Sequence, residues 1–356
     1  MRPIGYYVHH QGAGHWERAR RIAALLPRPC TLIGTLAGFE TGGAPGPVLD
    51  LPDDRMSVSF DGWDGGGDRP QGLHYAPLGH PGIRHRMARI ARWAEEADPV
   101  LLVVDVSVEV TILARLLSVP TLVFRLSGLR DDPPHLEAYR AAEEVIASFP
   151  EVLEDPEMPE WVRAKTFYAG LLAEPAPAGG PRGRDVVVVL GRGGVGIRLA
   201  ELAAAARAVP GRTWQVLGTV PDAQDGSCAL PPNLVLHGWV EDVAARLAGA
   251  GLVVGAAGDG VVAAAASAGA PFLCLPEPRA HEEQVRKAAA LARLGAAVVH
   301  EGWPAASDWP ALVERALALD PGRLSALAEP RAMERLAAEI EAVAKRIEAR
   351  PRPGVA

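Results

Sequence analysis

The chain has 356 residues, of which 49% are hydrophobic and 22% are charged, which is enough for about two domains with separate buried cores. Its formal net charge of −7 argues against a nucleic-acid-binding protein, because such proteins carry a basic surface. The three cysteines, Cys30, Cys228 and Cys274, form no CxxC pair, so neither a zinc finger nor a disulfide framework is expected. This composition favours a soluble, cytoplasmic protein without a metal site.

The longest apolar tract, residues 252–275, is interrupted by Asp259, several glycines and Pro271. A membrane-spanning helix needs about 20 mainly apolar residues, so we expect buried strands and a helix here instead. The apolar run near the N-terminus is too short for a signal peptide.

The first half of the chain alternates predicted strands and helices. An apolar run at 4–8 is followed by a glycine turn and a predicted helix. The runs VLLVVDV at 100–106 and PTLVFRL at 120–126 are typical of strands buried on both faces of a parallel sheet. Between residues 40 and 82 the composition shifts to glycine, proline and aspartate, which predicts a long loop.

Residues 83–97 have the pattern of a helix, with an apolar stripe of Ile83, Met87 and Ile90 surrounded by arginines. Such a helix could contact an anionic membrane through residues 83–93, which would place the protein at the inner membrane face. The alternative, which we favour, is that the stripe docks on the protein itself.

A proline- and glycine-rich stretch follows the first half and predicts a linker. The chain therefore divides into an N-terminal domain, a linker, a C-terminal domain and a final helix that packs back across the domains. Their expected bounds are 1–173, 174–184, 185–330 and 331–350.

The C-terminal half alternates strands and helices more clearly. A glycine-rich turn and a helix at 197–209 follow the run DVVVVLG at 185–191. Further predicted strands lie at 213–218, 234–238, 251–256, 271–276 and 296–300. This alternation predicts a doubly wound α/β domain, so we expect two Rossmann-like domains that face each other across a cleft.

The turn GRGGVG at 191–196 fits the GxGxxG pattern of dinucleotide-binding domains. The acid expected at the end of the next strand is missing, because Thr219 stands there, so binding of NAD is not favoured. The glycines let backbone N–H groups approach an anion, the helix N-terminus adds positive potential, and Arg192 adds a charge. We expect this turn to bind phosphate, with a tight turn without ligand as the alternative.

The first glycine turn, GAGHWERA, has Glu17 in place of the third glycine and His15 at the helix start. A histidine titrates near neutral pH and can accept a proton. Asp105, at the end of a predicted strand, could orient this imidazole or act as the base itself. The alternatives are an exposed histidine near a helix start and a carboxylate that caps the next helix.

A third glycine turn precedes a predicted helix of small residues. Gly258 and Gly260 would place another helix N-terminus at the cleft, where Asp259 is better suited to capping the helix than to binding phosphate. Glu283 and Gln284 stand near the start of the next helix, where their polar groups could bind sugar hydroxyls. An ordinary acid-rich first turn is the alternative.

These features resemble those of the GT-B glycosyltransferases, in particular the branch around MurG, the bacterial GlcNAc transferase of lipid II synthesis. The resemblance covers nearly the whole chain and is most specific in "VVVVLGRGGVG", "HGWVEDVAARLAGAGLVVGAAGDG" and "EEQVRKAAALARLGAAVV". It implies a metal-independent, inverting transfer of a hexosyl or N-acetylhexosaminyl group from a nucleotide diphosphate sugar, with UDP as the expected nucleotide. The acceptor would be a small molecule or a lipid-linked compound with a hydroxyl group, and no cofactor is implied.

Mapped onto this chain, the resemblance implies that the backbone of Val240 meets the base and that Gln284 holds the donor sugar. With the residues discussed above, the expected donor-binding set is Gly191, Arg192, Gly193, Gly194, Val240, Gly258, Asp259, Gly260, Glu283 and Gln284. The expected acceptor-side set is Gly12, Gly14, Arg18 and Arg125, and the expected catalytic residues are His15 and Asp105.

Two positions depart from the family pattern: Ala264 replaces a Glu that binds ribose, and Lys287 replaces an Asn. Ribose recognition must differ, or the donor is unusual, or donor turnover has been lost. The first turn is also similar to that of the nucleotide-sugar hydrolase of pseudaminic acid synthesis, in which His15 would activate water. A hydrolysing 2-epimerase and a non-catalytic nucleotide-sugar-binding protein are further alternatives.

Overall fold

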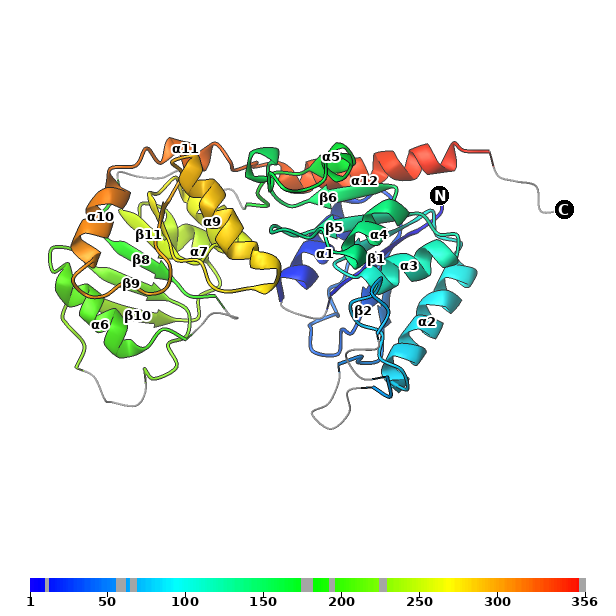
Figure 1. Cartoon of the computed structure of the whole chain (residues 1–356), viewed down its shortest axis with the longest axis horizontal. Coiled ribbons are helices and arrows are strands. Elements are labelled where there is room, and N and C mark those ends of the chain that lie inside the picture. The colour runs from blue at the N-terminus through cyan, green and yellow to red at the C-terminus, as the bar shows by residue number, and fades with distance from the viewer. Residues whose placement is uncertain are drawn as a thin grey trace.

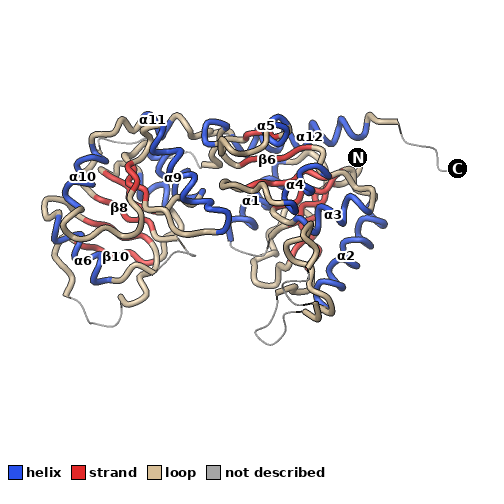
Figure 2. The backbone as a smooth tube through the Cα atoms, in the orientation of Figure 1, coloured by secondary structure: helices blue, strands red, loops and turns tan. Residues whose placement is uncertain are grey.

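The computed structural model of the chain forms two α/β domains that lie next to each other, each with a sheet at its centre and helices on both faces (Figure 1; Figure 2). The sheets consist largely of apolar runs buried on both faces, the pattern of parallel sheets covered by helices. The structure describes residues 1–9, 13–55, 62–64, 69–173, 182–191, 196–223 and 229–351.

The described part of the first domain contains a seven-stranded parallel sheet with the order β3-β2-β1-β4-β5-β6-β7. All residues of β1, β4 and β5 are buried. The strands are β1 (Ile4–Tyr7), β2 (Cys30–Gly34), β3 (Val48–Asp50), β4 (Leu101–Asp105), β5 (Thr121–Arg125), β6 (Glu144–Ala147) and β7 (Thr166–Tyr168). The helices are α1 (Ala13–Leu25), α2 (Pro81–Ala97), α3 (Val108–Leu116), α4 (Pro133–Ala141) and α5 (Glu160–Ala164), with a 3-10 turn at Glu151–Leu153.

The described part of the second domain contains a six-stranded parallel sheet with the order β10-β9-β8-β11-β12-β13. Its strands are β8 (Val186–Val189), β9 (Trp214–Leu217), β10 (Leu234–Gly238), β11 (Leu252–Gly255), β12 (Phe272–Cys274) and β13 (Val298–Val299). Its helices are α6 (Leu199–Ala208), α7 (Val243–Leu247), α8 (Asp259–Ala268), α9 (Glu283–Arg293), α10 (Trp309–Leu317) and α11 (Gly322–Ser325). A 3-10 turn, Ala280–Glu282, precedes α9.

In each sheet the first strand of the domain lies in the interior, between the strand that follows it and a later one. β1 pairs with β2 and β4, and β8 pairs with β9 and β11. The strand order therefore reverses at β1 and at β8, and ligands of such folds bind at the carboxyl ends of the strands beside this point. The two doubly wound, Rossmann-like domains predicted from the sequence are confirmed.

The last helix, α12 (Ala332–Glu348), returns to the first domain and lies along it (Figure 1). Its apolar face includes Leu336 and Ile340, which are buried in the same core as Ile4 and Ile22. The helix therefore completes the hydrophobic core of the N-terminal domain, although it follows the C-terminal domain in the chain.

A buried ion pair fixes α12 to the first domain. Arg28 is 4% exposed, and it donates to the two carboxylate oxygens of Glu341 at 2.7 and 2.8 Å. Arg28 also donates to Glu348 at 3.1 Å. These hydrogen bonds from Arg28 hold the pKa of Glu341 and of Glu348 below the ordinary value.

Helix α2 docks on the first domain by the apolar stripe that the sequence analysis singled out. Ile90 is buried in a core cluster of this domain. Arg86 is buried as well and pairs with Asp54 at 2.5 Å. The expected membrane contact through 83–93 is therefore not supported, because the protein itself covers the apolar face. Among the described residues, no helix combines the length and apolar character that a membrane span needs.

Several short strands of the structure were not predicted from the sequence. The segment at 40–82, predicted as one long loop, contains β3, which pairs with β2. Strands β2, β6 and β7 were also not predicted, although β2 is entirely buried. Residues 56–61 and 65–68 of this segment lie outside the described part of the chain.

Removing Arg28 should destabilise the first domain. In Arg28→Ala the carboxylate of Glu341 is left in a buried site without its partner, which costs about 3–5 kcal/mol in comparable pairs. The pKa of Glu341 is lowered in the folded state, so the pair stabilises the protein above about pH 4.3, and this contribution is lost as the pH falls. Urea unfolding at pH 7 and pH 4, followed by circular dichroism, measures both effects.

The matched control is Arg20→Ala, because Arg20 forms an exposed pair with Glu17 at 2.9 Å. Pairs of this kind contribute about 0–1 kcal/mol. Equal losses of stability in the two variants would contradict the proposed role of Arg28.

Candidate active site

The two residues expected to carry proton transfer lie in contact beside β1 and β4. His15 is in the first turn of α1, which follows β1, and Asp105 is the last residue of β4. The Nδ1 atom of His15 is 3.0 Å from Oδ1 of Asp105. Arg18, one turn further along α1, donates from Nη2 to the same oxygen at 2.6 Å. The parallel pairing of β1 with β4 thus brings together residues that are distant in sequence.

Asp105 is fully buried, so its partners decide its charge. Burial would raise the pKa of Asp105, but Arg18 and His15 outweigh this effect and hold the pKa below its ordinary value. Nδ1 of His15 also lies 3.0 Å from Nη2 of Arg18. In the tautomer whose Nδ1–H donates to Asp105, Nε2 is the nitrogen that can accept a proton. Val106, directly after Asp105, has a φ of 61°, a conformation that is costly for a β-branched residue and is found at functional sites.

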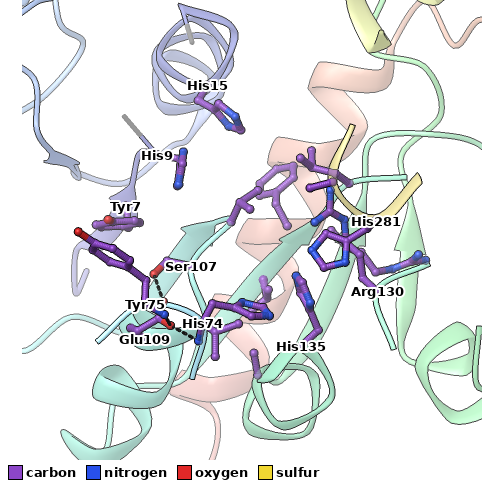
Figure 3. Close-up of a pocket in the computed structure, with 18 of the residues that line it drawn as sticks. Tyr7, His9, His15, His74, Tyr75, Ser107, Glu109, Arg130, His135 and His281 are labelled. Carbon is purple, nitrogen blue, oxygen red and sulfur yellow. Dashed lines mark hydrogen bonds between the residues drawn. The ribbon is translucent and has the colours of Figure 1, made fainter. Parts of the chain in front are cut away.

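A cavity of about 600 Å³ lies beside His15 and is lined by residues of both domains (Figure 3). The second domain contributes the segment Arg279, Ala280, His281 and Glu283. The labelled residues in Figure 3 that line it are Tyr7, His9, His15, His74, Tyr75, Ser107, Glu109, Arg130, His135 and His281. A cavity of this size, with a few polar groups on its wall, is typical of a small-molecule site.

Most polar residues of this cavity were missed by the sequence analysis, because they come from separate segments without a shared motif. Glu109, in the first turn of α3, accepts hydrogen bonds from the backbone nitrogens of His74 and Tyr75 at 2.8 Å each. The hydroxyl of Tyr75 donates to the backbone oxygen of Asp54 at 2.5 Å. Glu109 and Tyr75 therefore hold the end of the long loop against the cavity.

Two arginines expected on the acceptor side are engaged within the protein. Arg125 is buried and donates from both terminal nitrogens to Glu154. Arg18 is held by Asp105. Arg125 lines the first cavity with its charge paired to Glu154, and its expected role toward acceptor anions stays a prediction.

Glu283 connects the two domains instead of presenting a free carboxylate. Its Oε2 atom accepts a hydrogen bond from Nη2 of Arg130 at 3.0 Å. A second link joins Arg286 of α9 to Asp155 of the first domain at 2.9 Å. Glu283 also lines the first cavity, and its expected binding of sugar hydroxyls stays a prediction.

A second cavity, of about 770 Å³, lies at the carboxyl ends of β8, β9, β11 and β12. Gly191, the first residue of the predicted phosphate turn, lines it, and a Cβ atom added at Gly191 would contact nothing within 4 Å. Thr219, Trp239 and Trp303 also line this cavity. The two tryptophans were not singled out from the sequence, although Trp239 directly precedes Val240.

None of the other described donor-binding candidates lines this second cavity, although Val240 and Gln284 adjoin it through Trp239 and Glu277. Gly258 is the N-cap of α8 and Gly260 is in its first turn. Gln284 is buried, and its Oε1 atom accepts from the backbone nitrogens of Ala257 and Glu277 at 3.1 and 3.0 Å. Gln284 thus joins the loops that follow β11 and β12. Val240 is half-buried and packs against the core of the second domain.

Asp259 is the first residue of α8 and not its cap. Its carboxylate accepts a hydrogen bond from Lys287, whose side chain is buried. Burial would raise the pKa of Asp259, but Lys287, Arg18 and His15 lower it below its ordinary value. The hydroxyl of Ser148, from the first domain, donates to the same carboxylate at 3.5 Å, so the N-terminus of α8 lies at the domain interface.

Some expected residues cannot be placed. Gly12, Arg192, Gly193 and Gly194 lie outside the described residues. Gly14 is exposed in the first turn of α1, and a Cβ atom there would contact nothing within 4 Å.

No protein-family model and no curated protein matches the sequence. Among solved structures, the chain is similar to the calicheamicin glycosyltransferase CalG4, with 20% identity, a TM-score of 0.66, and coverage of 99% of this chain and 100% of that one. It is also similar to MurG of Acinetobacter baumannii, with 18% identity, a TM-score of 0.66, and coverage of 96% and 99%. The glycosyltransferase VinC in complex with dTDP has 15% identity, a TM-score of 0.68, and coverage of 97% and 100%.

At these identities the similarity shows the fold and not the activity. The chain has the two-domain GT-B fold that the sequence analysis expected. MurG is only one of several structures that match to a similar degree, so the placement in the MurG branch remains a prediction.

Replacing Asp105 should destabilise the first domain as well as change the site. In Asp105→Asn the guanidinium of Arg18, whose side chain is 11% exposed, loses its buried counter-charge, which costs about 3 kcal/mol or more in comparable cases. The pKa of Asp105 is lowered in the folded state, so this stabilisation is present above about pH 3.9 and is lost as the pH falls. Thermal unfolding at pH 7 measures the difference.

Glu17→Gln is the control, since Glu17 pairs with Arg20 at the surface. Its melting temperature should stay close to that of the unmodified chain. A melting temperature of Asp105→Asn within the range of this control would contradict the assignment of Asp105 as the buried counter-ion.

Proposed function

We propose that this chain is a glycosyltransferase that moves a sugar from a nucleotide diphosphate sugar to a hydroxyl group of an acceptor. The observation that carries the proposal is the contact between His15 and the buried carboxylate of Asp105 at the wall of the cavity between the domains. The GT-B fold supports it, because the similar structures include several glycosyltransferases.

The second cavity is the proposed site of the donor. Gly191 and the N-terminus of α8 offer backbone N–H groups to a diphosphate, and a helix N-terminus carries positive potential. The ring of Trp239 offers an apolar surface to the base, next to the backbone of Val240. We propose UDP or dTDP as the nucleotide, the latter because one similar structure is a complex with dTDP. The donor sugar is proposed to be a hexose or an N-acetylhexosamine.

The first cavity is the proposed site of the acceptor. Its volume of about 600 Å³ and its partly aromatic wall, with Tyr7 and Tyr75, favour a small molecule over a lipid-linked acceptor. Its polar groups surround the position where an acceptor hydroxyl would reach Nε2 of His15.

In the proposed reaction, His15 accepts the proton of the acceptor hydroxyl. The oxygen of this hydroxyl attacks the anomeric carbon of the donor sugar. The bond from this carbon to the diphosphate oxygen breaks, and both bonding electrons leave with the diphosphate. Attack from the side opposite to the leaving group inverts the configuration. Asp105 stabilises the imidazolium that forms, as in other carboxylate–histidine pairs. The N-terminus of α8 stabilises the departing diphosphate, so the proposal requires no metal at this position.

Replacing His15 should slow the reaction without preventing donor binding. A placed general base contributes about 10²- to 10⁴-fold, so kcat of His15→Ala should fall by that factor while the Kd of the nucleotide stays nearly unchanged. The assay measures release of UDP and dTDP from a panel of nucleotide sugars with small hydroxyl acceptors. His85→Ala, at an exposed position of α2, is the control, and unchanged turnover in His15→Ala would refute the assignment.

The same assay without acceptor separates the alternatives. Release of sugar that is as fast without acceptor as with it would identify a nucleotide-sugar hydrolase. Binding of nucleotide sugars with no turnover under any condition would identify a binding protein.

Gly191→Ala should weaken nucleotide binding without destabilising the protein. A Cβ atom at Gly191 has no protein contact within 4 Å, so the fold should tolerate it, but it would occupy space that a diphosphate needs for close approach to the backbone. We expect the Kd of UDP or dTDP to rise about tenfold or more, which is about 1.4 kcal/mol. Calorimetry measures the Kd.

Gly211→Ala is the matched control, because a Cβ there also meets nothing within 4 Å and Gly211 does not line the second cavity. If the Kd of UDP or dTDP is unchanged in Gly191→Ala, the turn at Gly191 is not part of the donor site.

A further inference from the structure

A cluster of imidazole and carboxylate groups lies in the wall of the first cavity, apart from His15 and Asp105. His74 Nε2 is 2.8 Å from Oδ1 of Asp132, and His135 Nδ1 is 2.6 Å from Oδ2 of the same carboxylate. The ring centres of the two histidines are 4.4 Å apart. His74, Asp132 and His135 each offer one possible ligand atom, and these three atoms all lie within 4.8 Å of one another.

The chemistry of this cluster suits a divalent transition metal of the zinc type. Zinc is bound by histidine nitrogens and carboxylate oxygens at about 2.0–2.2 Å, usually with four ligands. Nε2 of His74 and Nδ1 of His135 both point to the carboxylate of Asp132, so each ring presents one nitrogen to the position that an ion would occupy. The short distances to Asp132 are those of hydrogen bonds, and small outward shifts of the two rings would admit an ion between them.

A third histidine, from the second domain, reaches the same carboxylate. His281 Nδ1 is 3.6 Å from Oδ2 of Asp132, and its ring centre is 4.9 Å from that of His135. Figure 3 shows His74, His135 and His281 close together on one side of the cavity. His281 has a left-handed backbone conformation, with φ of 56°, which is uncommon outside glycine but enriched in histidine.

The nearby positive charge is largely balanced. Arg130 is adjacent to the cluster, and it would repel a cation. Its guanidinium is paired with Glu283 at 3.0 Å, and Asp132 brings a negative charge to the cluster itself.

We propose that His74, Asp132 and His135 bind a divalent transition metal, with His281 as the fourth ligand from the second domain. Such an ion would link the domains across the acceptor cavity. The proposal does not depend on the proposed transferase activity, because it concerns a site on the wall opposite His15.

The test uses the full-length chain without an affinity tag, stripped of metal with a chelator and then dialysed. Calorimetric titration with Zn²⁺ should show a single equivalent bound, and Co²⁺ should give the visible absorption of a tetrahedral site. His74→Gln should weaken Zn²⁺ binding about tenfold or more. Because His74 is exposed, this variant should fold normally.

His85→Gln is the control, since His85 is an exposed histidine of α2 outside the cluster, and it should bind Zn²⁺ as the unmodified chain does. His281→Gln should also weaken binding and change the Co²⁺ spectrum. The proposed metal site would be refuted if the protein binds no Zn²⁺, or if His74→Gln and the control bind Zn²⁺ with equal affinity. Unchanged affinity and spectrum in His281→Gln would overturn the link between the domains.

Discussion

The candidate site depends on one buried carboxylate, that of Asp105. Full burial makes its charge unfavourable unless partners surround it, and the structure provides two of them on a single helix, His15 and Arg18. Both lie in the first turns of α1, the helix that follows β1 in the chain. The parallel pairing of β1 with β4 then fixes the distance between the imidazole and the carboxylate. The same ion cluster thus contributes to the fold and orients the residue expected to carry the proton.

The described interface between the domains contains both charged pairs and apolar contacts. Arg130 pairs with Glu283, and Arg286 pairs with Asp155. Phe149 and Leu153 of the first domain are buried in the same hydrophobic cluster as Leu291 of the second. Because His281 and Glu283 of the second domain line the first cavity, the shape of this cavity depends on how the two domains pack.

The sequence predicted the strands that are long and continuous in β-branched residues, such as β4 and β8, and hence the two doubly wound domains. It did not predict β2 or β3, because a run such as CTLIG is short and lies beside a segment rich in glycine and proline. The contact of His15 with Asp105 could be anticipated, since both follow from strand ends. The cluster of His74, Asp132 and His135 could not, because its members come from a loop and a helix start, and only the tertiary fold brings them together.

The two departures from the glycosyltransferase pattern are connected through charge. A carboxylate at the first position of α8 stabilises the helix dipole, but it would repel a diphosphate at the same helix end. Lys287 donates a hydrogen bond to Asp259 and balances its negative charge. The N-terminus of α8 therefore carries no net negative charge that would repel an anionic ligand from the backbone N–H groups of its first turn. Ala264, on the same helix, carries no carboxylate. The carboxylates of Glu201 and Glu277, from other elements, line the second cavity.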